Sequence, residues 1–335
     1  MERRALIKQL MLTGMAAAIP FRKVWADMIP ALRAFKRPFH RFTVGELELT
    51  VITDGFIRLS PVQPNFPNGS EAAEKALLHE HFRPTSEMDL SMNILLIKKG
   101  NEVILIDTGT GGAFGKDSGW MLPSMADAGF TPEGVTAVII SHAHPDHVGG
   151  LVTKTGQPVF PNAKVYLSKP ENAFWMAPQQ DFSKSKFQDK QLLAVFTTGT
   201  QQTLKALGDR VQLFDDGAEL FGCIRMEIAP GHTPGHALTH IYSGNEKIVH
   251  VADLVHSDVL SIPHPEWGFN GDVDIAQAAA TRKKLLVRFA KEQTKVFAYH
   301  FPWPGIGYVK PEGSKWEWVP EAYAVPVAAA LPGRR

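Results

Sequence analysis

The stretch that decides the fold is Ser141-His142-Ala143-His144-Pro145-Asp146-His147, which follows the β-branched run Val138-Ile139-Ile140. The run predicts a short strand, and Pro145 ends it because proline cannot donate a hydrogen bond to a neighbouring strand. The histidines and the aspartate therefore leave the sheet in a loop at the end of this strand. Core packing does not explain so many ligand-type side chains in one short segment, which instead predicts a metal site.

Three further apolar runs also end in side chains that bind metals. Ile224 to Ile228 precedes Gly231-His232-Thr233-Pro234-Gly235-His236, Ile248 to Val251 precedes Asp253, and Val296 to Tyr299 precedes His300. A catalytic dication needs about four ligands, one of them water, so we predict two divalent metal ions that share these donors. The predicted ligands are His142, His144 and His232 for one ion, Asp146, His147 and His300 for the other, and Asp253 as the bridge.

The composition excludes other kinds of partner and site. The chain has 335 residues, 44% hydrophobic and 21% charged, which is typical of a globular protein. Its 35 Lys and Arg residues balance 34 Asp and Glu, so we expect no nucleic-acid partner. The single cysteine, Cys223, cannot form a thiolate cluster. Histidine and carboxylate ligands must therefore hold the metals, with zinc as our first expectation and manganese, cobalt or iron as alternatives.

The first 26 residues predict an export signal. Arg3-Arg4 precedes an uncharged run from Gln9 to Phe21, and Val24-Trp25-Ala26 offers small residues at a cleavage site. This pattern resembles a twin-arginine signal, and the run is shorter than the ~20 residues that span a bilayer. We expect a periplasmic or secreted bacterial protein with no stable membrane span. The alternative is a poorly ordered amphipathic amino terminus.

The rest of the chain predicts one α/β domain. Helical spacing is found in two longer patterns, 191–207 and 274–290, and loops are predicted at 61–67 and 301–304. We expect an amino-terminal arm at 27–40, the main domain at 41–320 and a carboxyl-terminal tail at 321–335. Besides the four runs above, strands are predicted at 47–52, 94–97, 103–106 and 165–167.

These motifs, in this order, resemble the metallo-β-lactamase superfamily. The signature His-x-His-x-Asp-His stands at 142–147, followed by the 231–236 motif, Asp253 and His300. Asp107-Thr108-Gly109 matches the upstream Asp-x-Gly turn of that superfamily. The resemblance implies an αββα sandwich, in which two mixed β-sheets are flanked by helices and a dinuclear site lies at one edge.

Within the superfamily, the chain resembles the methyl parathion hydrolases and their lactone- and aryl-ester-hydrolysing relatives. The matching segments include Phe39-His40-Arg41-Phe42, Ile52-Thr53-Asp54-Gly55 and Phe301-Pro302-Trp303-Pro304-Gly305-Ile306-Gly307. This resemblance implies an exported homodimer that acts on a small-molecule substrate. It also implies an aromatic pocket mouth, for which the candidates are Phe114, Trp175 and Trp303.

The resemblance also implies a mechanism. Two dications lower the pKa of a bridging water, and the resulting hydroxide attacks a carbonyl or phosphoryl group. We assign catalytic roles to Asp146, Asp253 and His256, with Asp146 or His256 as proton donor to the leaving group. Acyl-homoserine lactonases have a tyrosine where this chain has His256, so we expect lactones and aryl esters in general, with organophosphate triesters as poorer substrates.

Three alternative functions are open at this stage. A β-lactamase is one, but its metal-binding cysteine would follow the second histidine motif, and Cys223 precedes it. A glyoxalase-II-like thioesterase has the same donors, yet the segment after His300 is aromatic and proline-rich and not basic. A metal-binding module without enzymatic activity would need a saturated coordination sphere, which seven donors shared by two ions do not give.

Overall fold

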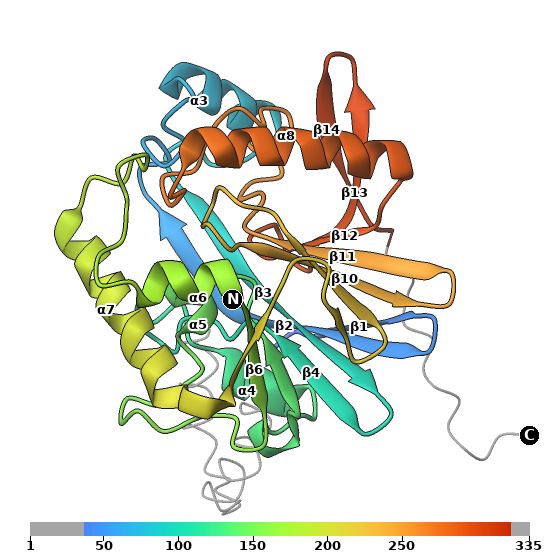
Figure 1. Ribbon diagram of the computed structural model, residues 1–335. Coiled ribbons are helices and arrows are strands. Elements are labelled where there is room, and N and C mark those ends of the chain that lie inside the picture. Colours follow the sequence, from blue (N-terminus) through green and yellow to red (C-terminus); the bar gives the residue numbers. More distant parts are fainter. Residues whose placement is uncertain (1–36, 323–335) are drawn as a thin grey trace, which may run out of the picture. The chain divides into compact units, whose positions relative to one another are not determined.

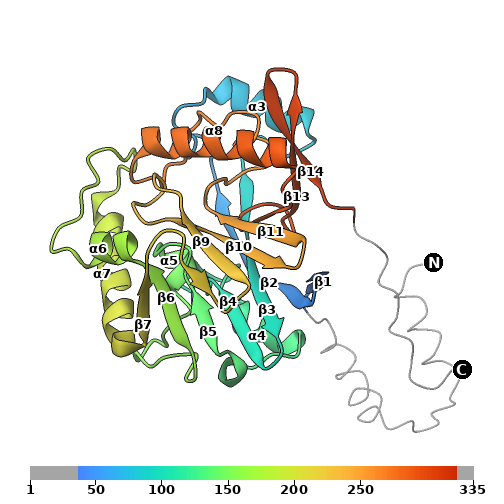
Figure 2. The ribbon, with the colours of Figure 1, turned by 45° about the vertical axis from the view of Figure 1, so that its right-hand side comes forward.

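The computed structural model describes residues 37–322, and they form two seven-stranded mixed sheets with helices outside (Figures 1 and 2). The first sheet contains, in spatial order, β1 (His40–Val44), β2 (Leu47–Leu59), β3 (Met88–Lys99), β4 (Glu102–Ile106), β5 (Ala137–Ile139), β6 (Lys164–Ser168) and β7 (Val211–Phe214). The second contains β14 (Lys315–Pro320), β13 (Ile306–Glu312), β12 (Val296–Ala298), β11 (Glu246–Ala252), β10 (Ala237–Ser243), β9 (Ile224–Ile228) and β8 (Glu219–Leu220). The predicted αββα sandwich is confirmed.

Alternating side chains on the strands explain the layers. On β3, Ile94 and Leu96 belong to a core cluster under the helices of the first sheet, whereas Leu95 and Ile97 belong to the cluster between the two sheets. Successive strand residues point to opposite faces, so a run that is apolar throughout is buried on both. The helices of the first sheet are α4 (Met121–Asp127), α5 (Pro145–Val148), α6 (Lys169–Met176) and α7 (Lys190–Leu207).

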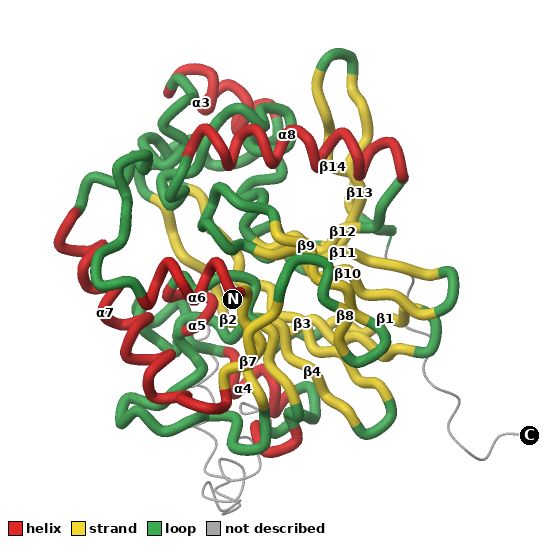
Figure 3. Tube along the Cα trace, viewed as in Figure 1, coloured by secondary structure: helices red, strands yellow, loops and turns green. Residues whose placement is uncertain are grey.

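One long helix covers the outer face of the second sheet (Figure 3). This is α8 (Ile275–Glu292), whose Leu285, Leu286 and Phe289 are buried in one cluster with Val249 and Val251 of β11. Asp274 caps its start by accepting a hydrogen bond from Gln277 N–H. A separate small cluster holds α3 (Glu71–Glu80) and the loop before it, through Leu78 and Phe66, against the 259–267 segment.

The predicted strand runs correspond to β2, β3, β4, β5, β6, β9, β11 and β12, and the two predicted helices correspond to α7 and α8. The runs 138–140 and 296–299 each extend one residue beyond β5 and β12, and the predicted helix 274–290 begins one residue early, at the N-cap Asp274. The segment after Pro145 differs from the prediction, because it is the short helix α5 with Pro145 in its first turn. The export signal and most of the arm and tail lie outside the described residues. Within 37–322, no helix is long and apolar enough to cross a membrane.

Candidate active site

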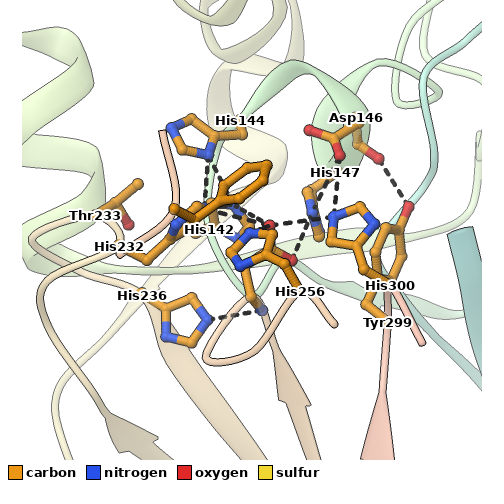
Figure 4. Close-up of polar contacts among 12 residues, drawn as sticks. His142, His144, Asp146, His147, His232, Thr233, His236, His256, Tyr299 and His300 are labelled. Carbon is orange, nitrogen blue, oxygen red and sulfur yellow. Dashed lines mark hydrogen bonds and ion pairs between the residues drawn. The ribbon is translucent and has the colours of Figure 1, made fainter. Parts of the chain in front are cut away.

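Three histidines from two loops converge at the edge between the sheets (Figure 4). His142 and His144 follow β5, and His232 follows β9. Their nitrogens are separated by 3.0 Å (His142 Nε2 to His144 Nδ1), 2.9 Å (His144 Nδ1 to His232 Nε2) and 3.1 Å (His232 Nε2 to His142 Nε2). Ligand atoms on one tetrahedral zinc ion would be roughly 3.3 Å apart at the usual bond lengths. These nitrogens are therefore arranged as three ligands of one ion.

A second group lies beside the first. His147 Nε2 is 3.6 Å from Asp146 Oδ2, and His300 Nε2 is 3.4 Å from the same oxygen. Asp253 joins this group, since its Oδ1 is 3.1 Å from His147 Nε2 and its Oδ2 is 3.2 Å from His300 Nε2. Asp146, His147, Asp253 and His300 thus form a second set of donors that could hold a metal ion.

Asp253 lies between the two groups. Its Oδ2 is also 3.3 Å from His232 Nε2 and 3.8 Å from His142 Nε2. The preceding Ala252 has φ +45, a strained value for alanine, and the Asp253 N–H donates to His236 Nε2 at 3.1 Å. His236 therefore fixes the backbone that presents the shared carboxylate.

The electrostatics of the cluster favour bound cations. Burial alone would lower the histidine pKa values, and it lowers the pKa of His144 to about 3, so that this ring is neutral. Burial is outweighed at His232 and His300, where nearby carboxylates, Asp253 foremost, raise both pKa values to about 9. His147 Nε2 and Asp253 Oδ1 lie 3.1 Å apart but make no hydrogen bond within residues 37–322. Imidazole nitrogens beside buried carboxylates are a donor set that divalent transition metals bind, and a bound dication would replace the protons that the carboxylates favour on His232 and His300. The residues therefore fit two such ions.

Buried carboxylates hold metal-donor histidines in place through hydrogen bonds from the second ring nitrogen. Asp107 Oδ2 accepts from His147 Nδ1 at 2.9 Å and from the Ser141 hydroxyl at 2.8 Å, so the Asp-x-Gly turn at 107–109 supports the metal loop. Asp272 Oδ1 accepts from His232 Nδ1 at 2.8 Å. Such contacts orient a ligating imidazole and fix its tautomer.

Glu171 is a supporting residue that the sequence analysis missed. It is fully buried at the start of α6 and accepts hydrogen bonds from Ala143 N, Trp175 Nε1, Thr233 Oγ1 and Gly235 N, at 2.6 to 2.9 Å. It thus ties the 142–144 segment to the 232–235 segment. The four-residue spacing of Glu171 and Trp175 could have indicated this contact from the sequence, because residues i and i+4 lie on the same face of a helix.

His256 lies in the cluster, but it does not line the cavity that opens on the metal donors. Its Nε2 is 3.1 Å from Asp253 Oδ2, and its ring stacks on Phe269 with centroids 3.7 Å apart. Burial lowers its pKa to about 4, so at neutral pH the ring is neutral and its Nε2–H donates to Asp253. This donor is therefore already used, which differs from the predicted role of His256 as a proton donor to the leaving group.

A cavity of about 210 Å³ opens on the donor cluster. His144, Asp146, His232, Asp253 and His300 lie at its polar end. The remaining wall is mostly apolar and comes from β2, β3, α7 and several loops. It includes Phe114, Phe182, Phe187, Phe196 and Phe269.

Of the three aromatics predicted at the pocket mouth, only Phe114 lines this cavity within the described residues. Trp175 is 1% exposed, with its ring edge-on to His144 at 5.6 Å, because its N–H is bound to buried Glu171. Trp303 packs against the cluster between the sheets. Neither tryptophan lines the cavity that the described residues form. The sequence could not show which face of its segment each side chain occupies.

A two-sheet sandwich with this donor cluster at the end of its strands defines a metal-dependent hydrolase. The chain belongs to the metallo-beta-lactamase superfamily, whose pattern matches residues 89–300. No curated protein sequence matches the chain.

Several solved structures are similar. One is AidC, a dizinc quorum-quenching lactonase solved in complex with a product, N-hexanoyl-L-homoserine. Its sequence is 40% identical to this chain, and the match covers 87% of this chain and 99% of AidC, with a TM-score of 0.84. The hydrolase AbOPH has 29% identity over 86% of this chain and 99% of its own, with a TM-score of 0.78. A quorum-quenching N-acyl homoserine lactone lactonase shares the fold at 19% identity. The match covers 78% of this chain and 94% of that lactonase, with a TM-score of 0.55.

Proposed function

We propose that the chain is a lactonase that opens the ring of N-acyl homoserine lactones. The observation that carries this proposal is the cavity, which has metal donors at one end and a wall of phenylalanine and leucine side chains beyond them. A substrate with a compact polar ring and an apolar chain matches both ends. The 40% identity with a lactonase solved with N-hexanoyl-L-homoserine supports the same substrate class.

In the proposed reaction, the oxygen of a water molecule bonds to the lactone carbonyl carbon, and the ring C–O bond breaks. The ring oxygen takes one proton and becomes the hydroxyl of the N-acyl homoserine product, whose new carboxyl group ionises. His142, His144 and His232 would hold one ion, Asp146, His147 and His300 would hold the other, and Asp253 would contact both. When bound, such ions supply Lewis acidity and lower the pKa of water.

Within the chain, Asp146 is the candidate proton carrier. Although burial opposes its ionisation, His147 and His300 lower the pKa of Asp146 to about 2, so it is a carboxylate at neutral pH. It lines the cavity and can accept the proton of the attacking water, then return it to the leaving oxygen. His256 acts through Asp253 and is a positioning residue.

Aryl esters are a second candidate substrate class, and the phenylalanines favour it. Phe114 and Phe196 lie 6.0 Å apart and Phe187 and Phe196 lie 6.3 Å apart, so an aryl group entering the cavity meets several rings. Such contacts contribute about 0.5–1.5 kcal/mol each beyond the buried area. Phosphotriesters present their bulk in three directions around phosphorus, which suits a cavity with one long wall less well.

The test is a substrate panel on one zinc-loaded preparation. It compares N-hexanoyl-homoserine lactone, a γ-alkyl lactone, phenyl acetate, a diethyl aryl phosphotriester, a glutathione thioester and a β-lactam by kcat/KM. We expect the N-acyl lactone to have the highest kcat/KM, the alkyl lactone and the aryl ester to follow, and the phosphotriester to come after them. The glutathione thioester and the β-lactam should be unreactive. A phosphotriester, thioester or β-lactam at the head of the order would overturn the proposal.

A further inference from the structure

The cavity wall contains one side-chain amide that is not used by the protein. Asn270 lines the cavity beside Phe269 and Gly271. Its amide makes no hydrogen bond to any residue in the described range 37–322, whereas the Asn65 amide nitrogen donates to two backbone carbonyls and the Ser185 hydroxyl accepts from Phe187 N–H. Among the polar side chains that the structure describes in this wall away from the metal end, Asn270 is thus the one whose side chain makes no hydrogen bond at all.

The backbone around Asn270 is fixed next to the metal end. Its N–H donates to Asn65 O at 2.8 Å, and Phe269 N–H donates to Asp272 Oδ2 at 2.9 Å. Asp272 in turn holds His232. A Cβ placed on Gly271 would lie 3.6 Å from His232 Cε1, so this turn passes directly beside the donor cluster. Asn270 therefore lies where the polar end of the cavity meets the phenylalanine wall.

We infer that Asn270 donates a hydrogen bond to the amide carbonyl of an N-acyl substrate and so selects N-acyl lactones over plain alkyl lactones. In such a substrate, the amide joins the ring to the chain, so with the ring at the donors and the chain against the phenylalanines the amide lies at this boundary. A buried amide without a partner is unfavourable, and Asn270 offers the partner. This inference rests on the proposed function and names the feature of the substrate that the site reads.

The experiment compares the zinc-loaded wild type with Asn270→Leu, which keeps the side-chain size and removes the amide. Asn101→Leu, in the exposed turn between β3 and β4, is the matched control. Two substrates are used, N-hexanoyl-homoserine lactone and a γ-alkyl lactone of equal length without the amide. We expect Asn270→Leu to lower kcat/KM about 10- to 100-fold for the first. The second should change by less than about twofold, which also shows that the variant is folded and loaded.

Binding provides a second readout. The product N-hexanoyl-homoserine should bind Asn270→Leu more weakly than wild type by a similar factor in calorimetry, and the amide-free hydroxy acid should bind both equally. Equal losses for both ligands, or no loss for either, would overturn the role of Asn270 while leaving the lactonase intact. A wild type that opens the alkyl lactone but not the N-acyl lactone would instead overturn the proposed function, and this inference with it.

Discussion

Two buried glutamates allow a matched test of how the site is held together. Glu171 and Glu74 are 0% and 1% exposed, respectively. Glu171 accepts four hydrogen bonds that tie the two histidine segments together. Both carboxylate oxygens of Glu74, on α3, make no hydrogen bond to any residue between 37 and 322. The same change, Glu to Gln, should therefore have opposite effects at the two positions.

The expected loss at Glu171→Gln follows from its contacts. One oxygen becomes an NH₂ group, so two donors lose their acceptor and face another donor. Hydrogen bonds to a charged group contribute about 1.5–3 kcal/mol each, and removing a buried charge offsets part of the loss, which leaves about 2–4 kcal/mol. The melting temperature should fall by roughly 5–12 °C. Zinc affinity should fall about 10- to 100-fold, because the loops that carry His144 and His232 are no longer tied.

The change Glu74→Gln should be harmless or stabilising. Burial, followed by repulsion from Glu71, raises the pKa of Glu74 to about 7 from an ordinary value of 4.5. Its ionisation therefore opposes folding increasingly as pH rises from about 4.5 through 7. Glu74→Gln should melt at or above the wild-type temperature at pH 8 and show little difference at pH 4.5.

Scanning calorimetry and zinc titration against a chelator would measure both variants. A stable, fully zinc-binding Glu171→Gln would refute the reasoning, as would a Glu74→Gln variant that loses as much stability as Glu171→Gln.

The remaining predictions concern metal content, substrate preference and export. Wild type should carry about two metal ions per chain, and Asp253→Ala should lose at least one of them and most activity; elemental analysis that finds full occupancy with a normal rate would contradict the shared-donor role. His256→Leu should lower lactone, aryl-ester and phosphotriester turnover in parallel, because it acts through Asp253; a selective loss for one substrate would show that it contacts substrate. Replacing Arg3 and Arg4 by lysine should leave an uncleaved precursor in the cytoplasm, and normal export on fractionation would exclude a twin-arginine signal.

The metal donors could be predicted from the sequence because the short segments that carry them come soon after recognisable strands. Runs such as Val138-Ile139-Ile140 and Val296 to Tyr299 are recognisable locally. They form β5 of the first sheet and β12 of the second, so the runs alone do not show that His142 and His300 lie together. That expectation comes from the resemblance to the superfamily. Several strands were missed, namely β1, β7, β8, β10, β13 and β14. Of these, β10 begins directly after His236 and mixes polar residues into both faces, so its run is not continuous.

The supporting residues and the cavity wall could not be predicted in the same way. Glu171 and Asp272 lie in ordinary helical or turn sequence, and their role appears only when a distant loop places its donors against them. The direction in which an aromatic side chain points is likewise determined by the residues packed around it. Trp175 points inward because Glu171 binds its N–H, whereas Phe187 reaches the cavity from an irregular loop.

The cavity has two kinds of boundary, and they differ in how freely they can change over evolutionary time. Its polar end is built from short segments at strand termini, each constrained by a buried partner such as Asp107, Glu171 or Asp272. Part of the apolar wall comes from the irregular 182–187 segment, which supplies Phe182 and Phe187. Surface loops accept substitutions more readily than the elements they join. Descendants of this chain can therefore acquire new substrates by changing the wall while they inherit the same reaction.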